Sequence, residues 1–397
     1  MGKRANGEGT VRQRPNGTWE ARLHYDDPET GKRVRRSFYG RTAKAARDAM
    51  KAGRDRIDAG APVKDAAITV ADWLVRWRAT TLAASDRSES TKALYGNLAR
   101  KHLEPEPFGA TRLDRLKATD VEALILRMRA KTKPGKAIED DEEPQPVRAL
   151  SDSTIRQAYT VLRAALDGAV RDGLLARNPA AAVKRPGVAR REAQHLGGDD
   201  VLAVLAAAEG SRYYPVLALI AGTGLRRGEA LALTWDRVDL TKGTVTVAAT
   251  LGRVGNRLLI SEPKSERSRR TVPVTPGMVA LLRKQKATQA AEKLRAANQW
   301  RDRTGLVFTT ELGAPVEPRN VLRVVETAAR AAGVAEIGVH TLRHSAAVGM
   351  LESGVHIKQV ADLLGHSSIA VTGDVYGHGS DDGARAAVTA LAARIGL

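Results

Sequence analysis

Two arginines, a lysine, two histidines and a tyrosine in the second half of the chain could together act on one phosphodiester. They are Arg226, Lys264, His340, Arg343, His366 and Tyr376. Guanidinium, ammonium and imidazole groups can neutralise a phosphate and move protons, and a tyrosine hydroxyl can attack phosphorus. The set therefore indicates phosphoryl transfer that needs no metal.

Arg226 and Glu229 lie in the segment AGTGLRRGEA, which at first looks like a glycine-rich phosphate loop. In such a loop the glycines let bare backbone approach a pyrophosphate, whereas here two arginines occupy that place. The segment therefore favours phosphate binding through a guanidinium. Glu229 lies three residues after Arg226, on the same helix face, where its carboxylate could hold that guanidinium. An ordinary surface ion pair is the alternative.

Lys264 lies between two strand-like runs in EPKSERSRRTVPV, so we expect it on a hairpin loop, either solvated or reaching into a DNA groove. His340 and Arg343 share a helix face in HTLRHS. His340 and His344 also have the spacing of a zinc protease helix. However, Arg343 lies between them and no glutamate follows His340, so the pattern argues against a metal site.

The order and spacing of these motifs resemble the tyrosine recombinase, or phage integrase, family. The matching motifs are TGLRRGE around Arg226, PKSERSRR around Lys264, HTLRH around His340 and Arg343, LLGHSS around His366 and VYGH around Tyr376. The resemblance is specific over residues 195–380 and looser over the helical region before them. The motif NGTWEAR extends it to the first 60 residues.

The resemblance implies how the site would hold its substrate. Arg226 and Arg343 would clamp the non-bridging oxygens of the scissile phosphate, a task suited to planar bidentate donors. His366 would hydrogen-bond the same phosphate. Glu229 would orient Arg226.

The resemblance also implies the chemical steps. Tyr376 would attack phosphorus and form a 3′-phosphotyrosine, with His340 helping to move the tyrosine proton. Lys264 would be the general acid for the departing 5′-hydroxyl. The covalent link would conserve the energy of the broken bond, so the reaction would need neither ATP nor a cofactor.

Three regions must position these residues. Residues 1–60 contain three short strand-like runs with turns between them, followed by a helix capped by Thr42. Residues 67–180 have helical periodicity, with Thr119 and Ser153 as expected N-caps and an aperiodic charged loop between the two helices. Residues 194–397 are helical with one β segment. We therefore expect a multidomain, mainly α protein with small β elements.

The resemblance names these regions. The first would be an arm-type DNA-binding domain, the second a helical, SAM-like core-binding domain and the third an α+β catalytic domain. Their partners would be core-type and arm-type sites on double-stranded DNA, three further copies of the chain in a homotetramer, and a host- or element-encoded directionality or bending factor.

The composition agrees with a polyanionic partner. The chain of 397 residues carries a formal net charge of +19 and has an isoelectric point near 10.3. Such a charge favours nucleic acid, with an anionic membrane surface as the alternative. There is no cysteine, which excludes disulfides and thiolate chemistry, and no apolar run long enough to span a bilayer. We expect a bacterial cytoplasmic, nucleoid-associated protein without a membrane partner.

Several questions stay open at this point. A type IB topoisomerase would use similar chemistry, and a non-catalytic DNA-binding regulator would also explain the charge. The residues do not identify the attachment sites or the directionality factor. They also do not distinguish an origin in a phage, an integrative element or the host. Residues 381–397 have the pattern of an amphipathic helix, which would pack either on its own domain or on a neighbouring protomer.

Overall fold

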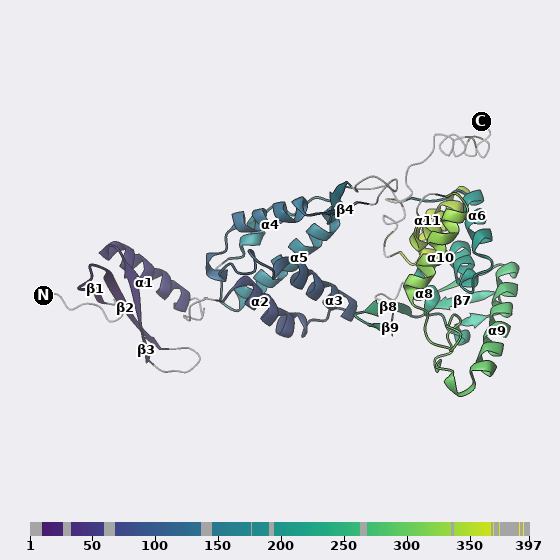
Figure 1. Ribbon diagram of the computed structural model, residues 1–397, viewed down its shortest axis with the longest axis horizontal. Coiled ribbons are helices and arrows are strands. Elements are labelled where there is room, and N and C mark those ends of the chain that lie inside the picture. Colours follow the sequence, from purple (N-terminus) through teal and green to yellow (C-terminus); the bar gives the residue numbers. More distant parts are fainter. Residues whose placement is uncertain are drawn as a thin grey trace. The chain divides into compact units, whose positions relative to one another are not determined.

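The structure is a computed structural model of the chain. It describes residues 10–26, 33–58, 68–135, 145–175, 177–189, 194–262, 268–334 and 337–366, and the isolated positions 368, 373, 389 and 392. The chain divides into two compact units, Met1–Ala189 and Arg190–Leu397. Its described parts are mainly helical with small sheets, which confirms the predicted fold class (Figure 1).

A three-stranded antiparallel sheet and one helix begin the described chain. The strands are β1 (Thr10–Gln13), β2 (Trp19–Asp26) and β3 (Arg33–Gly40), in the order β1-β2-β3, and the helix is α1 (Ala43–Asp58). Gly17 turns the chain between β1 and β2 with a φ of 81°, and Thr42 caps α1 by accepting from the Ala45 backbone N–H. The predicted strands, turn and cap are therefore present.

The two faces of this sheet differ because side chains alternate along a strand. Ala21 and Leu23 of β2 are buried together with Ala46 of α1. Glu20 points to the other face, where Ser37 and two arginines on the sheet donate to its carboxylate. The hydrogen bond from Ser37, followed by that from Arg22, lowers the pKa of Glu20 to about 2 although burial opposes the shift.

The rest of the first unit is a helical bundle. Its elements are α2 (Val70–Trp77), η1 (Arg78–Leu82), α3 (Glu89–Leu98), η2 (Ala99–Leu103), η3 (Leu113–Arg115), α4 (Ala118–Ala130), α5 (Asp152–Arg171) and η4 (Pro179–Ala182). One apolar core, with Trp73, Leu103 and Leu162 among its fully buried members, holds these helices together. The indole N–H of Trp73 donates to the Ala165 carbonyl of α5, 92 residues away in the chain.

Two predicted caps in this bundle were wrong, and one predicted loop has a short ladder at its base. Ser151, not Ser153, caps α5, because the Ser151 hydroxyl accepts from the Thr154 backbone N–H and Ser153 already lies in the first turn. Likewise α4 begins at Ala118, so Thr119 lies inside it. The expected charged loop is closed at its base by a two-stranded ladder, β4 (Thr132–Pro134) with β5 (Pro146–Arg148), and residues 136–144 lie outside the described chain.

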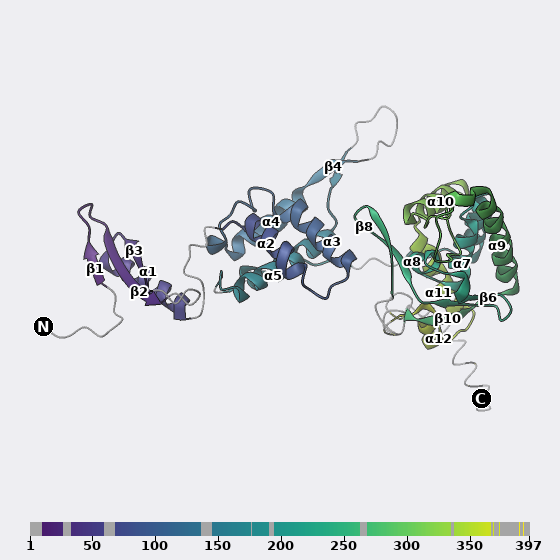
Figure 2. The ribbon, with the colours of Figure 1, turned by 90° about the horizontal axis from the view of Figure 1, so that it is seen from below.

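In the second unit, helices lie around a small sheet (Figure 2). Its helices are α6 (Gly198–Ala208), α7 (Tyr214–Thr223), α8 (Arg227–Leu231), η5 (Trp235–Arg237), α9 (Pro276–Ala296), η7 (Ala297–Gln299), α10 (Pro318–Ala331), α11 (Val339–Glu352) and α12 (Ile357–Leu364). Its strands are β6 (Val238–Asp239), β7 (Thr244–Val247), β8 (Thr250–Val254), β9 (Arg257–Ser261) and β10 (Arg270–Pro273). Strands β10, β7 and β6 form one antiparallel sheet in that order, and β8 pairs with β9 as a hairpin.

Helix α7 lies at the centre of this unit, and its end positions the candidate site. Leu217, Leu219 and Ile220 of α7 are fully buried, so the helix is apolar nearly all round. It ends at Gly224, whose φ of 67° is left-handed and whose added Cβ would lie 2.4 Å from the Leu364 Cδ2 atom of α12. Glycine is therefore required here both for the backbone turn and for the close approach of the two helix ends.

None of the described helices is both long enough and apolar enough to cross a lipid bilayer.

The bundle core generates a stability prediction. Leu162 of α5 is fully buried, whereas Leu126 of α4 is 63% exposed. We expect Leu162→Ala to lower the free energy of unfolding by about 2–5 kcal/mol, because it leaves a cavity. The matched change Leu126→Ala should alter it by less than about 0.5 kcal/mol. Urea unfolding followed by circular dichroism measures both values, and equal losses would contradict the placement of α5 in the core.

Candidate active site

Arg226 lies in the turn between α7 and α8, where the Glu229 carboxylate holds it. The Arg226 backbone N–H donates to Glu229 Oε2 at 2.9 Å, and its Nη1 donates to Glu229 Oε1 at 2.8 Å. Arg226 keeps 37% of its side chain exposed, while only 5% of the Glu229 side chain is. The carboxylate is therefore part of the protein interior, and the guanidinium that it holds remains accessible to a ligand.

Arg343 enters the same place from α11 and is almost completely buried. Its Nη1 donates to the Gly224 carbonyl at 2.6 Å, and its Nη2 donates to the Leu364 carbonyl at 2.9 Å. The Nη2 atom also lies 2.8 Å from His366 Nε2. One guanidinium thus connects the end of α7, the end of α12 and the histidine that follows α12.

The end of α12 completes the arrangement. Gly365 adopts a left-handed φ of 65°, and the His366 backbone N–H donates to the Ala361 carbonyl. Arg226 donates to the Gly365 carbonyl at 3.2 Å and reaches the Leu364 carbonyl at 3.5 Å. Unpaired carbonyls at a helix C-terminus carry partial negative charge, so the guanidiniums satisfy them and gain favourable charge interactions in return.

His340 lies one turn before His344 on α11, and their ring centroids are 6.4 Å apart. Burial, followed by the charges of Arg343, Arg227 and Arg226, lowers the pKa of His340. An imidazole with a lowered pKa is neutral near pH 7 and can accept a proton. His340 is therefore neutral near pH 7, the state in which an imidazole nitrogen can accept a proton.

The pKa of His366 is also lowered. Burial and then the charge of Arg343, with smaller contributions from Arg226 and Arg270, lower its pKa to about 4. A guanidinium can only donate hydrogen bonds, so Nε2 of neutral His366 must accept from Arg343. The remaining proton is then on Nδ1, which fixes the tautomer of the ring.

The structure brings four of the six predicted chemical residues together, with Glu229 beside them: Arg226, His340, Arg343 and His366. Lys264 and Tyr376 lie outside the described residues, as do almost all positions of the predicted tail helix at 381–397. Along the chain Lys264 lies between β9, which pairs with β8, and β10, which pairs with β7.

Arg270 also belongs to the site, and the sequence analysis missed it. Only 7% of its side chain is exposed, and it donates to both carboxylate oxygens of Glu229. A signal was present in RRTVPV, because Arg270 lies two residues before the buried Val272 on the same strand face. A basic side chain on an inward face requires a buried acceptor.

The family model described as "Phage integrase family" matches residues 194–382. A tyrosine recombinase XerC-like protein of Caldanaerobacter subterraneus subsp. tengcongensis is 28% identical, over 88% of this chain and 89% of its own length. An integrase of Streptomyces ambofaciens is 28% identical, over 94% and 93%. The tyrosine recombinase XerC of Xanthomonas axonopodis pv. citri is 30% identical, over 58% of this chain and 69% of its own length.

Two solved structures share the fold. The Tn1549 transposon integrase in complex with transposon right end DNA has a TM-score of 0.63 at 20% identity, over 82% of this chain and 99% of that one. The lambda integrase tetramer bound to a Holliday junction has a TM-score of 0.56 at 19% identity, over 96% and 99%.

The chain belongs to the tyrosine recombinase, or phage integrase, family. It is a site-specific DNA recombinase, as the motifs predicted.

The environment of His366 generates a pH prediction. We expect its imidazole to titrate near pH 4 in the folded protein rather than near 6.5, the usual pKa of a histidine. The unfolded state then takes up the proton first as the pH falls. The stabilisation from neutral His366 is therefore complete above about pH 6.5 and is lost as the pH falls through about 4. Proton–carbon NMR of the histidine rings measures the midpoint, and the spectrum of His366→Gln assigns the signal. A midpoint near 6.5 would contradict the contact with Arg343.

Proposed function

We propose that this recombinase breaks and rejoins DNA through a covalent 3′-phosphotyrosine at Tyr376, without a metal and without ATP. The convergence of Arg226, Arg343 and His366 on the ends of α7 and α12 carries the proposal. Two guanidiniums and a neutral imidazole at one place suit an anion with several oxygens.

Substrate binding would begin at Arg226. Its guanidinium is the more exposed of the two, and Glu229 restricts its orientation, so it can meet a non-bridging oxygen with little loss of side-chain entropy. Arg343 would stabilise the same phosphate from its buried position. His366, with its proton on Nδ1, would donate a hydrogen bond to a phosphate oxygen.

Bond breaking would follow by in-line attack. The Tyr376 oxygen bonds to phosphorus, its proton passes to His340, and the bond from phosphorus to the 5′-oxygen breaks while Lys264 donates a proton to that oxygen. The lowered pKa of His340 keeps it neutral and able to accept that proton near pH 7. The phosphotyrosine retains the energy of the broken bond, so attack by a new 5′-hydroxyl reseals the strand without ATP.

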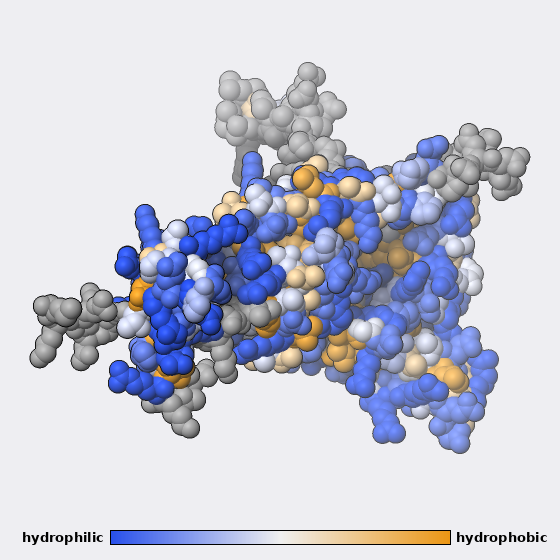
Figure 3. All heavy atoms as spheres, turned by 60° about the vertical axis from the view of Figure 1, so that its left-hand side comes forward, coloured by the Kyte–Doolittle hydropathy of each residue, from blue (hydrophilic) through white to orange (hydrophobic). Residues whose placement is uncertain are grey.

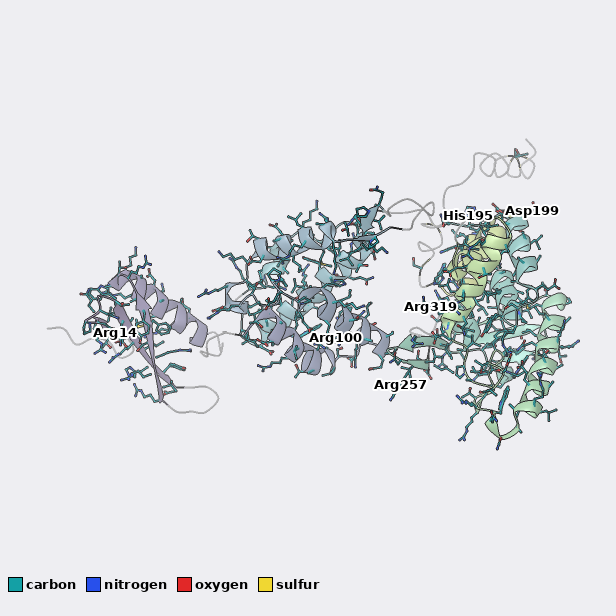
Figure 4. The ribbon with its side chains drawn as sticks, viewed as in Figure 1. Arg14, Arg100, His195, Asp199, Arg257 and Arg319 are labelled. Carbon is teal, nitrogen blue, oxygen red and sulfur yellow. The ribbon has the colours of Figure 1, made fainter. Side chains whose placement is uncertain are left out.

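Double-stranded DNA would be the partner of the whole chain. The net charge is +19, and the face seen in Figure 3 is mostly hydrophilic. Exposed arginines come from every described region (Figure 4): Arg14 after β1, Arg100 on η2, Arg257 on β9 and Arg319 on α10. Of the similar integrases, that of Tn1549 is bound to transposon right end DNA, and that of lambda forms a tetramer on a Holliday junction. We infer core-type sites and a homotetramer for this chain as well.

Each of the three regions of the chain would have its own role. Residues 1–60 would bind arm-type sites, residues 67–180 would bind core-type sites, and residues 194–397 would carry out the chemistry. A host- or element-encoded bending or directionality factor would set the direction of recombination. The reaction would take place in the bacterial cytoplasm, at the nucleoid. The basic three-stranded sheet supports the first assignment, since β-ribbons of this kind can enter a DNA groove.

The nucleophile is tested by Tyr376→Phe. We expect this variant to bind core-site DNA with wild-type affinity but to form no covalent adduct on a suicide substrate, because only the attacking hydroxyl is removed. Wild-type protein should form the adduct equally well with excess EDTA. Denaturing gels detect the adduct, and gel-shift titration measures the affinity.

Two controls make this result specific. Tyr25→Phe removes a hydroxyl from β2, outside the catalytic unit, and should leave adduct formation unchanged. An adduct in Tyr376→Phe would refute the nucleophile. Loss of the wild-type adduct in EDTA, restored by Mg²⁺, would refute the metal-free mechanism.

The arm-binding assignment is tested by footprinting. We expect a chain that begins at residue 61 to protect core sites like the full chain but to leave a second, separate class of sites unprotected. Two linked binding modules raise the effective concentration of each at its own site. Circular dichroism shows whether the shortened chain is folded. Identical footprints from the two folded proteins would make the first 60 residues a structural appendage.

A further inference from the structure

Arg270 is a second nearly buried cation of the described site, beside Arg343. It begins β10 and reaches α8, α12 and the stretch of chain just before β10. Its Nη1 donates to Glu229 Oε1 at 3.3 Å and to the Ser268 carbonyl at 3.2 Å, and its Nη2 donates to Glu229 Oε2 at 2.8 Å. Its Nε donates to the Leu363 carbonyl near the end of α12. Nothing in the predicted chemistry accounts for a third arginine at this place.

Arg270 is not placed to touch DNA. Only 7% of its side chain is exposed, and these four hydrogen bonds use most of the five N–H groups of a guanidinium. Any effect of Arg270 on the reaction must therefore pass through the groups that it holds.

The first such group is the Glu229 carboxylate, which lies between two guanidiniums. Burial by itself would raise the pKa of Glu229, but the hydrogen bond and charge of Arg270, followed by the contacts from Arg226, outweigh it and lower the pKa. Glu229 and Arg226 alone would form a neutral pair with little attraction for a phosphate. With Arg270 the three groups carry one net positive charge, and the only exposed member is Arg226.

The second group is the turn that ends α12. A Cβ added to Gly365 would lie 2.7 Å from Arg270 Nη1, so the guanidinium packs directly against the residue before His366. Arg270 thereby supports the backbone from which His366 extends toward Arg343.

We propose that Arg270 is a positioning residue: it compensates the charge of Glu229, so that Arg226 remains an effective cation toward the scissile phosphate, and it fixes the α12 turn. The proposal rests on the proposed function, because it assigns the substrate phosphate to Arg226.

The test uses the full chain with Arg270→Met and Arg270→Lys. The measured quantity is the single-turnover rate of adduct formation on a suicide substrate at saturating DNA. We expect Arg270→Met to lower this rate by about 10- to 100-fold, the effect of losing hydrogen bonds to a charged group. Arg270→Lys retains the charge but loses the planar fork, so it should recover part of the rate. Core-site affinity should change by less than about threefold, because Arg270 does not contact DNA.

Arg269→Met is the matched control. Arg269 is the preceding residue in the chain, but it is 56% exposed and pairs with Glu262, which is itself 81% exposed. Its loss removes the same charge and nearly the same volume from a solvated site. We expect a rate within about twofold of wild type, since surface changes of this kind have small effects.

A double-mutant cycle with Glu229→Gln separates positioning from packing. If Arg270 acts by compensating Glu229, Arg270→Met should cost much less when Glu229 is already neutral. The pH profile gives a second readout. Removing Arg270 raises the pKa of Glu229, so in Arg270→Met the rate should begin to fall at a higher pH on the acid side than in wild type. A defect in packing alone would not change the pH at which the rate begins to fall.

The measurements on the Arg270 variants can support or overturn the proposed role of Arg270. Partial rescue by lysine, coupling to Glu229→Gln and a shifted acid limb together support the proposal. A wild-type rate in Arg270→Met, equal rates for Met and Lys, or additivity with Glu229→Gln would overturn it. A loss of rate matched by a loss of folded protein, as seen by circular dichroism, would also overturn it. Absence of an adduct with the wild-type protein would instead refute the proposed function.

Discussion

The Glu229 carboxylate between the guanidiniums of Arg226 and Arg270 is the interaction on which the described site depends. A site for a phosphodiester needs concentrated positive charge, and concentrated like charges repel one another. The protein offsets this repulsion with one buried carboxylate and with the carbonyl groups at the ends of α7 and α12. A buried ion pair of this kind tolerates the loss of neither partner, because the remaining charge would be uncompensated in the interior.

The same concentration of charge determines the state of the histidines. Burial and the surrounding arginines lower the pKa of His340, His344 and His366 alike. The positive charge of the described site therefore comes from its arginines, while the imidazoles remain neutral. Neutral imidazoles can accept protons and donate hydrogen bonds, whereas guanidiniums remain charged, so one electrostatic cause determines the charge state of the histidines in the described site.

The close approach of α7 and α12 is what makes the site compact. Gly224 and Gly365 end these helices in left-handed conformations, and a side chain at either position would collide with the opposite helix end or with Arg270. The backbone carbonyls at these ends thereby come within reach of side chains from the turn before α8, from β10 and from α11. Glycines at two turns thus allow contacts between groups that are far apart in the chain, such as Arg226 and Gly365, which are 139 residues apart.

Local patterns were sufficient for much of this description. The spacing of Arg226 and Glu229 predicted their contact, the turn signals predicted the first sheet, and the order of motifs predicted the family. The cap at Ser153 was misplaced because Ser151 also lies near the start of α5, and only the hydrogen bond made by Ser151 distinguishes the two. The cap at Thr119 was misplaced because α4 already begins at Ala118. The residue types and their order along the chain therefore determined the class of chemistry, since that depends on side-chain groups. Only the tertiary structure decided that Arg270 meets Glu229 and that Arg343 meets His366, because these contacts depend on how buried helices and strands pack across long stretches of chain.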